Sequence, residues 1–168
     1  TLTESLTERG FSVVSAMDGE LGSMDRQIFD VEDHVEEALE VLSDCEIVIA
    51  AVGECSADIG EATSKTCLRL SPNQEKLIRS LKEAGKTVIT LVFSGRPLEI
   101  KPVLPYSDAL VQAWFLGSES AAGLTDVLSG DYNPSGRLSM SFPQTVGQIP
   151  VYYNSYRTGR PYYGQKDH

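Results

Sequence analysis

Two short segments decide the fold: IVIAAV at residues 47–52 and TVITLVF at residues 87–93. Both are continuous apolar runs rich in β-branched residues, a pattern typical of strands that are covered on both faces in a parallel sheet. The segment ALVQAWF at residues 109–115 predicts a third such strand. Because parallel strands need crossover connections, the sequence predicts an α/β fold in which ligands bind beyond the carboxyl ends of the strands.

Helical segments alternate with these strands. Residues 31–42 carry apolar side chains at helical spacing. Ser71, Pro72 and Gln74 have the types expected at a helix N-terminus with a capping box, and Gly85 predicts the C-terminal stop. Residues 119–129 predict another helix, and residues 11–16 and 137–142 predict further strands, the first of them preceded by a short helix. The result is a three-layer α/β/α sandwich.

The composition disfavours several classes of function. A length of 168 residues suits one domain, and a net charge of −10 without a basic cluster disfavours nucleic acid as a partner. No apolar run is long enough for a membrane span. Cys45, Cys55 and Cys67 form an odd set that we expect to be buried free thiols, and two histidines, His34 and His168, are too few for a metal cluster. No motif predicts a cofactor.

Chemistry is expected in the loop after the first strand, where Glu54, Asp58 and Glu61 occur. A carboxyl group there can be partly desolvated and can serve as a general acid, whereas the alternative is a solvated acidic loop. Arg96 follows the second strand at the same edge of the sheet. Its guanidinium can bond a substrate hydroxyl or form a structural ion pair.

Several ordered motifs resemble glycoside hydrolase family 3, the β-glucosidase family, and in particular its second domain in periplasmic bacterial enzymes. They cover roughly residues 30–163. The motifs are AVGE (51–54), GEATSK (60–65), LRLSPNQ (68–74), SGRPL (94–98), AWFLG (113–117), GDYNPSGRL (130–138), SFP (141–143), GQIPVYY (147–153) and TGRP (158–161).

The resemblance implies a sandwich of about six strands that supplies the acid/base glutamate of a retaining glycosidase, while an N-terminal barrel supplies the nucleophile. Both Glu54 and Glu61 follow a glycine, as the acid/base glutamate of the family often does. We expect Glu54 to be catalytic because it directly follows the strand, with Glu61 as the second candidate. Lys65 and Arg96 are the expected substrate contacts, although relatives commonly have arginine where Lys65 stands, which weakens any bidentate contact.

These expectations make the chain one part of an enzyme that removes β-linked glucose or a similar sugar. Residues 1–142 form the sandwich and residues 143–168 its extended tail; the barrel is absent, so we expect the chain alone to be inactive. The partners are a β-linked oligosaccharide or glucoside and the barrel, with self-association near Trp114 and Phe115. A periplasmic or secreted location is implied. The alternatives are a non-catalytic carbohydrate-binding or interaction module and a flavodoxin-like nucleotide binder.

Overall fold

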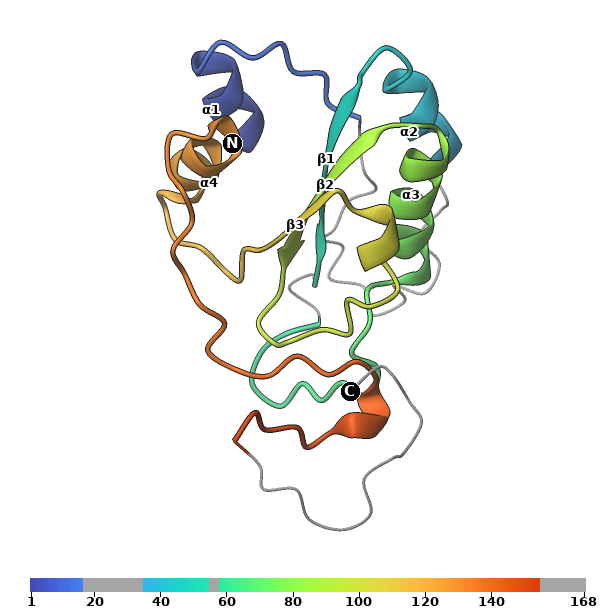
Figure 1. Ribbon diagram of the computed structural model, residues 1–168, viewed down its shortest axis with the longest axis vertical. Helices are drawn as coiled ribbons and strands as arrows, with labels where there is room; N and C mark the ends of the chain where they lie inside the picture. The colour runs from blue at the N-terminus through green and yellow to red at the C-terminus, as the bar shows by residue number, and fades with distance from the viewer. Residues whose placement is uncertain (17–34, 55–57, 155–168) are drawn as a thin grey trace.

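The computed structural model describes residues 1–16, 35–54 and 58–154. Three strands form a parallel sheet in the order β1-β2-β3, with helices on both of its faces (Figure 1). On one side lie α1 and α4, and on the other lie α2 and α3. The elements are α1 (Leu2–Glu8), α2 (Val35–Val41), β1 (Ile47–Gly53), α3 (Pro72–Glu83), β2 (Thr87–Phe93), β3 (Ala109–Gln112) and α4 (Ser120–Ser129), with the 3₁₀ helices η2 (Leu104–Tyr106) and η3 (Val146–Gln148).

The predicted α/β sandwich with a parallel sheet is confirmed, but the sheet is smaller than expected. Residues 11–16 and 137–142 are irregular, so the described residues contain three strands where about six were predicted. A strand exists only where a neighbour completes its hydrogen-bond ladder, and a local alternating pattern does not provide that neighbour. Both segments lack such a neighbour in the described part of the chain.

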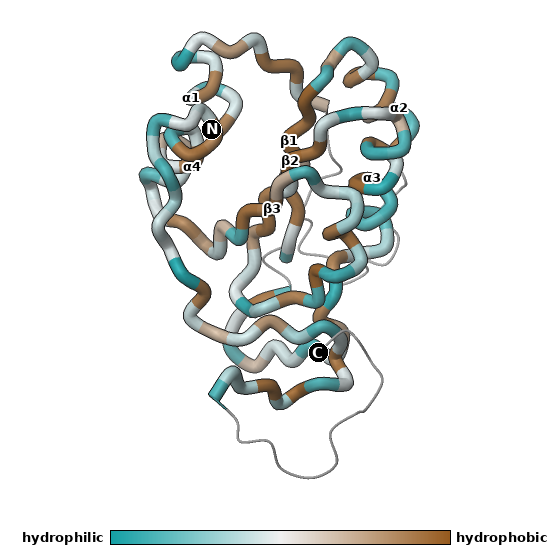
Figure 2. The backbone as a smooth tube through the Cα atoms, in the orientation of Figure 1, coloured by the Kyte–Doolittle hydropathy of each residue, from teal (hydrophilic) through white to brown (hydrophobic). Residues whose placement is uncertain are grey.

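The core is divided between the two faces of the sheet. One cluster joins the sheet to α2 and α3 and includes Val88, Ile78 and Leu81; the other joins it to α4 through Leu91 and Leu124. The hydrophobic strands therefore lie between more hydrophilic helices (Figure 2). Ile47, the first residue of β1, is 61% exposed instead of covered on both faces, and Thr87, the first residue of β2, is exposed as well.

The helix α3 begins as the sequence predicts, with one difference. Ser71 accepts a hydrogen bond from the backbone N–H of Gln74 at 3.3 Å, and Pro72 is the first helical residue. The side chain of Gln74 does not complete the capping box. It donates instead to the carbonyl oxygen of Gly53 at 3.1 Å, and so links the start of α3 to the end of β1.

Charged side chains tie the helices to the sheet and to each other. Asp108 accepts hydrogen bonds from Lys82 in α3 and from the backbone N–H of Val88 in β2, and these bonds, the one from Lys82 foremost, hold the pKa of Asp108 below its ordinary value of 3.8. On the opposite side, Arg9 after α1 forms ion pairs with Asp126 and Asp131 at the end of α4.

Cysteine burial differs from the expectation. Cys45 is half-buried and Cys67 is exposed, and both are free thiols; Cys55 lies outside the described residues, as do His34 and His168. Cys67 belongs to an irregular segment without a covering element, so its side chain reaches the surface. None of the described helices has the length and hydrophobicity needed to cross a membrane.

We expect Gly53→Ala to destabilise the protein by about 3 kcal/mol or more. Gly53 has φ +148°, and a Cβ added there would lie 1.8 Å from the carbonyl oxygen of Phe93 in the neighbouring strand. Urea denaturation measures the effect. Gly85→Ala is the matched control: its φ is +79° but an added Cβ meets no atom within 4 Å, so backbone strain alone should cost about 1 kcal/mol. Equal losses in the two variants would contradict the close approach of β1 and β2.

Candidate functional site

Three loops leave the carboxyl ends of the strands at one edge of the sheet. The first loop comprises residues 54–65, the second residues 94–97 and the third residues 113–118, with residues 55–57 outside the described part. In Figure 1 the described part of the first loop and the second loop lie below the strands, near the C-terminal segment, and the third loop leads from β3 towards α4. This is the edge at which ligands bind in open parallel sheets.

Glu54 starts the first loop and points into the protein. Its backbone N–H continues the ladder by donating to the carbonyl oxygen of Phe93 at 2.8 Å. Its side chain is only 1% exposed, and Oε2 accepts a hydrogen bond from the backbone N–H of Gly95 at 3.1 Å. The carboxylate thus joins the first loop to the second.

Two cations face the other oxygen of Glu54. Nη1 of Arg96 lies 3.2 Å from Oε1, and Nζ of Lys65 lies 3.5 Å from the same atom. Nη1 makes no hydrogen bond within the described residues, so its contact with Glu54 is an ion pair without hydrogen-bond alignment. The side chains of Lys65 and Arg96 are 22% and 24% exposed. A buried carboxylate needs such partners, because an unpaired buried charge is costly.

Hydrogen bonds from neutral polar side chains hold the second loop in place. Ser94 is fully buried, and its hydroxyl donates to the carbonyl oxygen of Arg96 at 2.8 Å. The amide nitrogen of Gln112, at the end of β3, donates to the same hydroxyl at 3.0 Å. These bonds fix the backbone that carries Gly95 and Arg96.

The third loop packs against the second loop at Gly95. A Cβ added to Gly95 would lie 2.9 Å from Cε2 of Phe115 and 3.9 Å from Cγ2 of Ile59. The absence of a side chain at Gly95 therefore lets the first and third loops approach the second. Trp114 has φ +57° and its ring meets that of Phe142 edge to face, with centroids 5.8 Å apart.

Glu61 has a different environment from Glu54. It is exposed and lies in a turn closed by the hydrogen bond from the N–H of Thr63 to the carbonyl oxygen of Gly60 at 3.3 Å. Ala62 in this turn has φ +60°. Among the described residues Glu61 forms no hydrogen bond or ion pair, so both oxygens of its carboxyl group are accessible.

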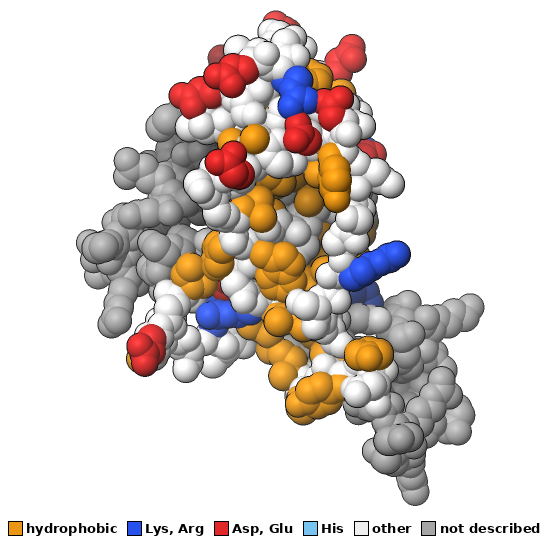
Figure 3. Space-filling model, turned by 90° about the vertical axis from the view of Figure 1, so that its left-hand side faces the viewer, with side chains coloured by type: hydrophobic (Ala, Val, Ile, Leu, Met, Phe, Trp, Pro, Cys, Tyr) orange, Lys and Arg blue, Asp and Glu red, His pale blue; other side chains and the backbone are white. Residues whose placement is uncertain are grey.

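Apolar side chains are exposed near the loops. Figure 3 shows hydrophobic side chains in a band that leads from the acidic upper end of the molecule to its lower end. We use the name apolar surface for the exposed apolar side chains of the third loop and the C-terminal segment, which are Phe115, Leu116, Leu138, Met140, Tyr152 and Tyr153; Tyr153 is 95% exposed.

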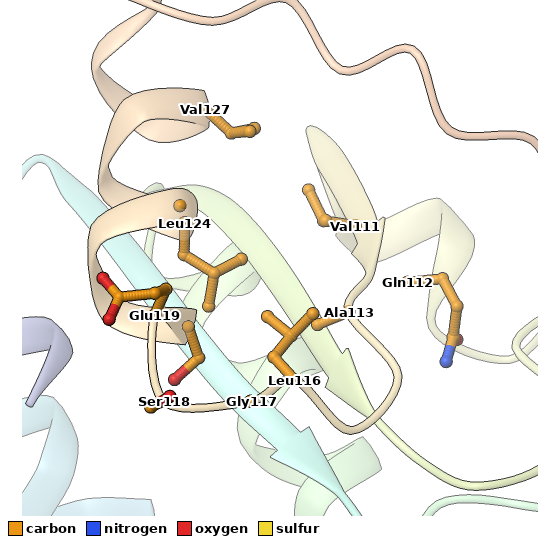
Figure 4. A pocket seen from close by; sticks show the side chains of 11 residues that line it. Val111, Gln112, Ala113, Leu116, Gly117, Ser118, Glu119, Leu124 and Val127 are labelled. Carbon is orange, nitrogen blue, oxygen red and sulfur yellow. The ribbon is translucent and has the colours of Figure 1, made fainter.

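A pocket of about 510 Å³ lies between the end of β3 and α4. In Figure 4 Leu116, Leu124 and Val111 face one another across it, while the side chain of Gln112 points away. The lining is mostly apolar and contains a single carboxyl group, that of Glu119. Among the described residues, the lining of this pocket includes no paired carboxyl groups and no cation, whereas the three loops bring Glu54, Lys65 and Arg96 together.

The structure brings together three of the four predicted site residues. Glu54, Lys65 and Arg96 form one ion-pair cluster, whereas Glu61 lies apart at the surface. The sequence analysis missed the backbone N–H of Gly95 as a partner of Glu54. The glycine between Ser94 and Arg96 was the available signal, since glycine is needed where backbones or rings approach closely.

Comparison with known proteins adds independent findings. The family described as the glycosyl hydrolase family 3 C-terminal domain matches residues 2–167. The chain is 42% identical over 132 residues to a periplasmic beta-glucosidase of Salmonella typhimurium and 33% identical over 117 residues to a beta-xylosidase of Formosa agariphila, covering 79% and 70% of the chain. A beta-glucosidase from Listeria innocua, solved in complex with gluconolactone, superposes with a TM-score of 0.80 at 40% identity over 95% of the chain. The chain spans only 17%, 16% and 21% of these three relatives.

The two glutamates should differ sharply in their effect on stability. Glu54→Ala leaves Lys65 and Arg96 without their buried partner, so we expect the free energy of unfolding to fall by about 3 kcal/mol. Glu61→Ala removes an exposed, unpartnered side chain and should change it by less than about 0.5 kcal/mol. Urea denaturation of both variants checks this. A similar loss in both would contradict the burial and pairing of Glu54.

Proposed function

Because the chain belongs to the C-terminal domain family of the family 3 glycosyl hydrolases, we propose that it supplies the general acid/base of a retaining β-glycosidase. Retaining hydrolysis needs two carboxyl groups about 5 Å apart, one to attack the anomeric carbon and one to protonate the leaving oxygen. In this proposal the N-terminal barrel of the parent polypeptide carries the nucleophile. The relatives' names support β-linked glucose or xylose as the sugar.

Glu61 is the proton donor in this proposal. A general acid must come within hydrogen-bond reach of the glycosidic oxygen, about 3 Å, and that oxygen lies in a cleft outside the sandwich. The observation that carries the assignment is the exposed carboxyl group of Glu61, which has no partner among the described residues. This reverses the order that position after the strand suggested, in which Glu54 came first.

The environment of Glu54 supports the same reversal. Its side chain is almost fully enclosed, Oε2 is occupied by Gly95 and Oε1 faces Lys65 and Arg96. Protonating a leaving group from this position would require the second loop and both cations to move away. In this proposal the main role of Lys65 and Arg96 is to pair with Glu54. Direct binding of the substrate by either residue is a lesser role.

The apolar surface is the proposed contact with the barrel. Its members are exposed in this chain, although burial of aromatic side chains is strongly favourable. The surface reaches the first loop, since Phe115 and Ile59 both approach Gly95, so a domain that packs there would lie near the loop that carries Glu61. The isolated chain is then expected to self-associate through the same side chains. A periplasmic or secreted location is proposed from the name of the Salmonella relative.

The function is tested in the full-length parent with Glu61→Ala. For β-glucosides with poor leaving groups we expect kcat/KM to fall by about 10²- to 10⁴-fold, because the departing oxygen is no longer protonated. Dinitrophenyl glucoside, whose leaving group needs no proton, should be affected far less. Azide should partly restore turnover by attacking the glycosyl-enzyme, which releases glucosyl azide and the free nucleophile carboxylate.

Two controls complete the experiment. The isolated chain should show no turnover, since it carries one half of the carboxyl pair. Glu119→Ala is the matched control for removing a glutamate near the loops and should retain activity. Uniform loss on all leaving groups in Glu61→Ala, without glucosyl azide, would reject Glu61 as the acid. Unchanged activity would favour the non-catalytic module.

A further inference from the structure

Both carboxylate oxygens of Glu54 have partners, and these partners come from two different loops. Oε2 binds the backbone of the second loop at Gly95, while Oε1 faces Arg96 of that loop and Lys65 at the far end of the first loop. One carboxylate therefore holds the end of the first loop against the second.

Lys65 also closes the first loop on itself. Its Nζ lies 3.2 Å from Oδ1 of Asp58 and 3.5 Å from Oε1 of Glu54. The segment from Asp58 to Lys65 is thus a short loop whose first and last residues are joined by an ion pair. Glu61 lies near the middle of that segment, in the turn closed between Gly60 and Thr63.

The third loop reinforces the junction. The ring of Phe115 and the side chain of Ile59 both lie within 4 Å of the position that a Cβ would take on Gly95, whose N–H is bound by Glu54. Ile59 is next to Asp58 in the first loop, so this packing and the ion pairs restrain the same segment. Groups that act in catalysis need such support, because a displacement of about 1 Å can lower a rate by about 10²-fold.

We propose that Glu54 is a positioning residue that, through Lys65 and the second loop, fixes the place of the Glu61 carboxyl group. This inference rests on the proposed role of Glu61 as the general acid. Glu54 itself does not touch the substrate. Its negative charge matters because it is the shared partner of two cations from two loops, so it holds the loop that Lys65 and Asp58 close against the second loop.

The test uses the full-length parent with Glu54→Gln, which preserves the size of the side chain and an acceptor for Gly95 but removes the charge. For a β-glucoside with a poor leaving group, kcat should fall by about 10- to 100-fold while KM changes by less than about twofold. For dinitrophenyl glucoside, kcat/KM should be affected little, because this parameter reports the first step, in which the leaving group needs no proton. Azide should give no glucosyl azide above the unsubstituted enzyme, because Glu61 is still present.

A double-mutant cycle separates positioning from general damage. In the Glu61→Ala background, Glu54→Gln should change kcat for the poor leaving group by less than about twofold, because no acid remains to be positioned. The same 10- to 100-fold loss in both backgrounds would overturn the inference, as would no loss in either. The single variant Glu61→Ala tests the acid role of Glu61 by itself. A failure of that role can therefore be told apart from a failure of the positioning role of Glu54.

Lys65→Met provides a second variant if Glu54→Gln does not fold. It should show the same loss of kcat on poor leaving groups and the same dependence on Glu61. Lys86→Met is the matched control: Nζ of Lys86 bonds the carbonyl oxygen of Ser43 at 2.6 Å, beside the start of β2, at the opposite end of the sheet from the three loops. It should leave kcat and KM unchanged. An effect of Lys65→Met on KM alone would overturn the inference in favour of substrate binding by Lys65.

Discussion

A carboxylate removed from water must find cations or hydrogen-bond donors inside the protein, because an unpaired buried charge costs several kcal/mol. At the carboxyl end of β1 this requirement is met by groups from two different loops. Gly95 and Arg96 approach Glu54 from the loop after β2, and Lys65 approaches from the end of the loop after β1. The parallel sheet makes this possible, since its strands all deliver their loops to one edge.

The same constraint separates the two glutamates chemically. Glu54 is committed to its partners, whereas Glu61 stands on a turn with its carboxyl group exposed. A buried, paired carboxylate stabilises loops, and an accessible one can exchange protons with a ligand. In the proposed function, a second domain that packs on the exposed apolar surface would enclose such a ligand. The family membership and the short share of each relative that this chain spans agree with that division.

The sequence predicted those elements that depend on residues close together in the chain. The β-branched runs became β1 and β2, and Ser71 and Pro72 began α3 as expected. Features that depend on distant partners were not predictable. Residues 11–16 have a strand pattern but no neighbouring strand within the described parts of the chain, and the side chain of Gln74 bonds Gly53 instead of its own helix. The burial of Glu54 depends on Arg96 from another loop, and no local pattern around Glu54 reveals it.

A crystal structure of the full-length parent with a slowly hydrolysed β-glucoside in its cleft tests the central claim most directly. The account predicts the Glu61 carboxyl group within about 3 Å of the glycosidic oxygen and about 5 Å from a carboxylate of the barrel. It also predicts that Glu54 stays beneath the loops with Lys65 and Arg96. A structure in which Glu54 contacts the glycosidic oxygen, with both cations turned away from it, would contradict the account.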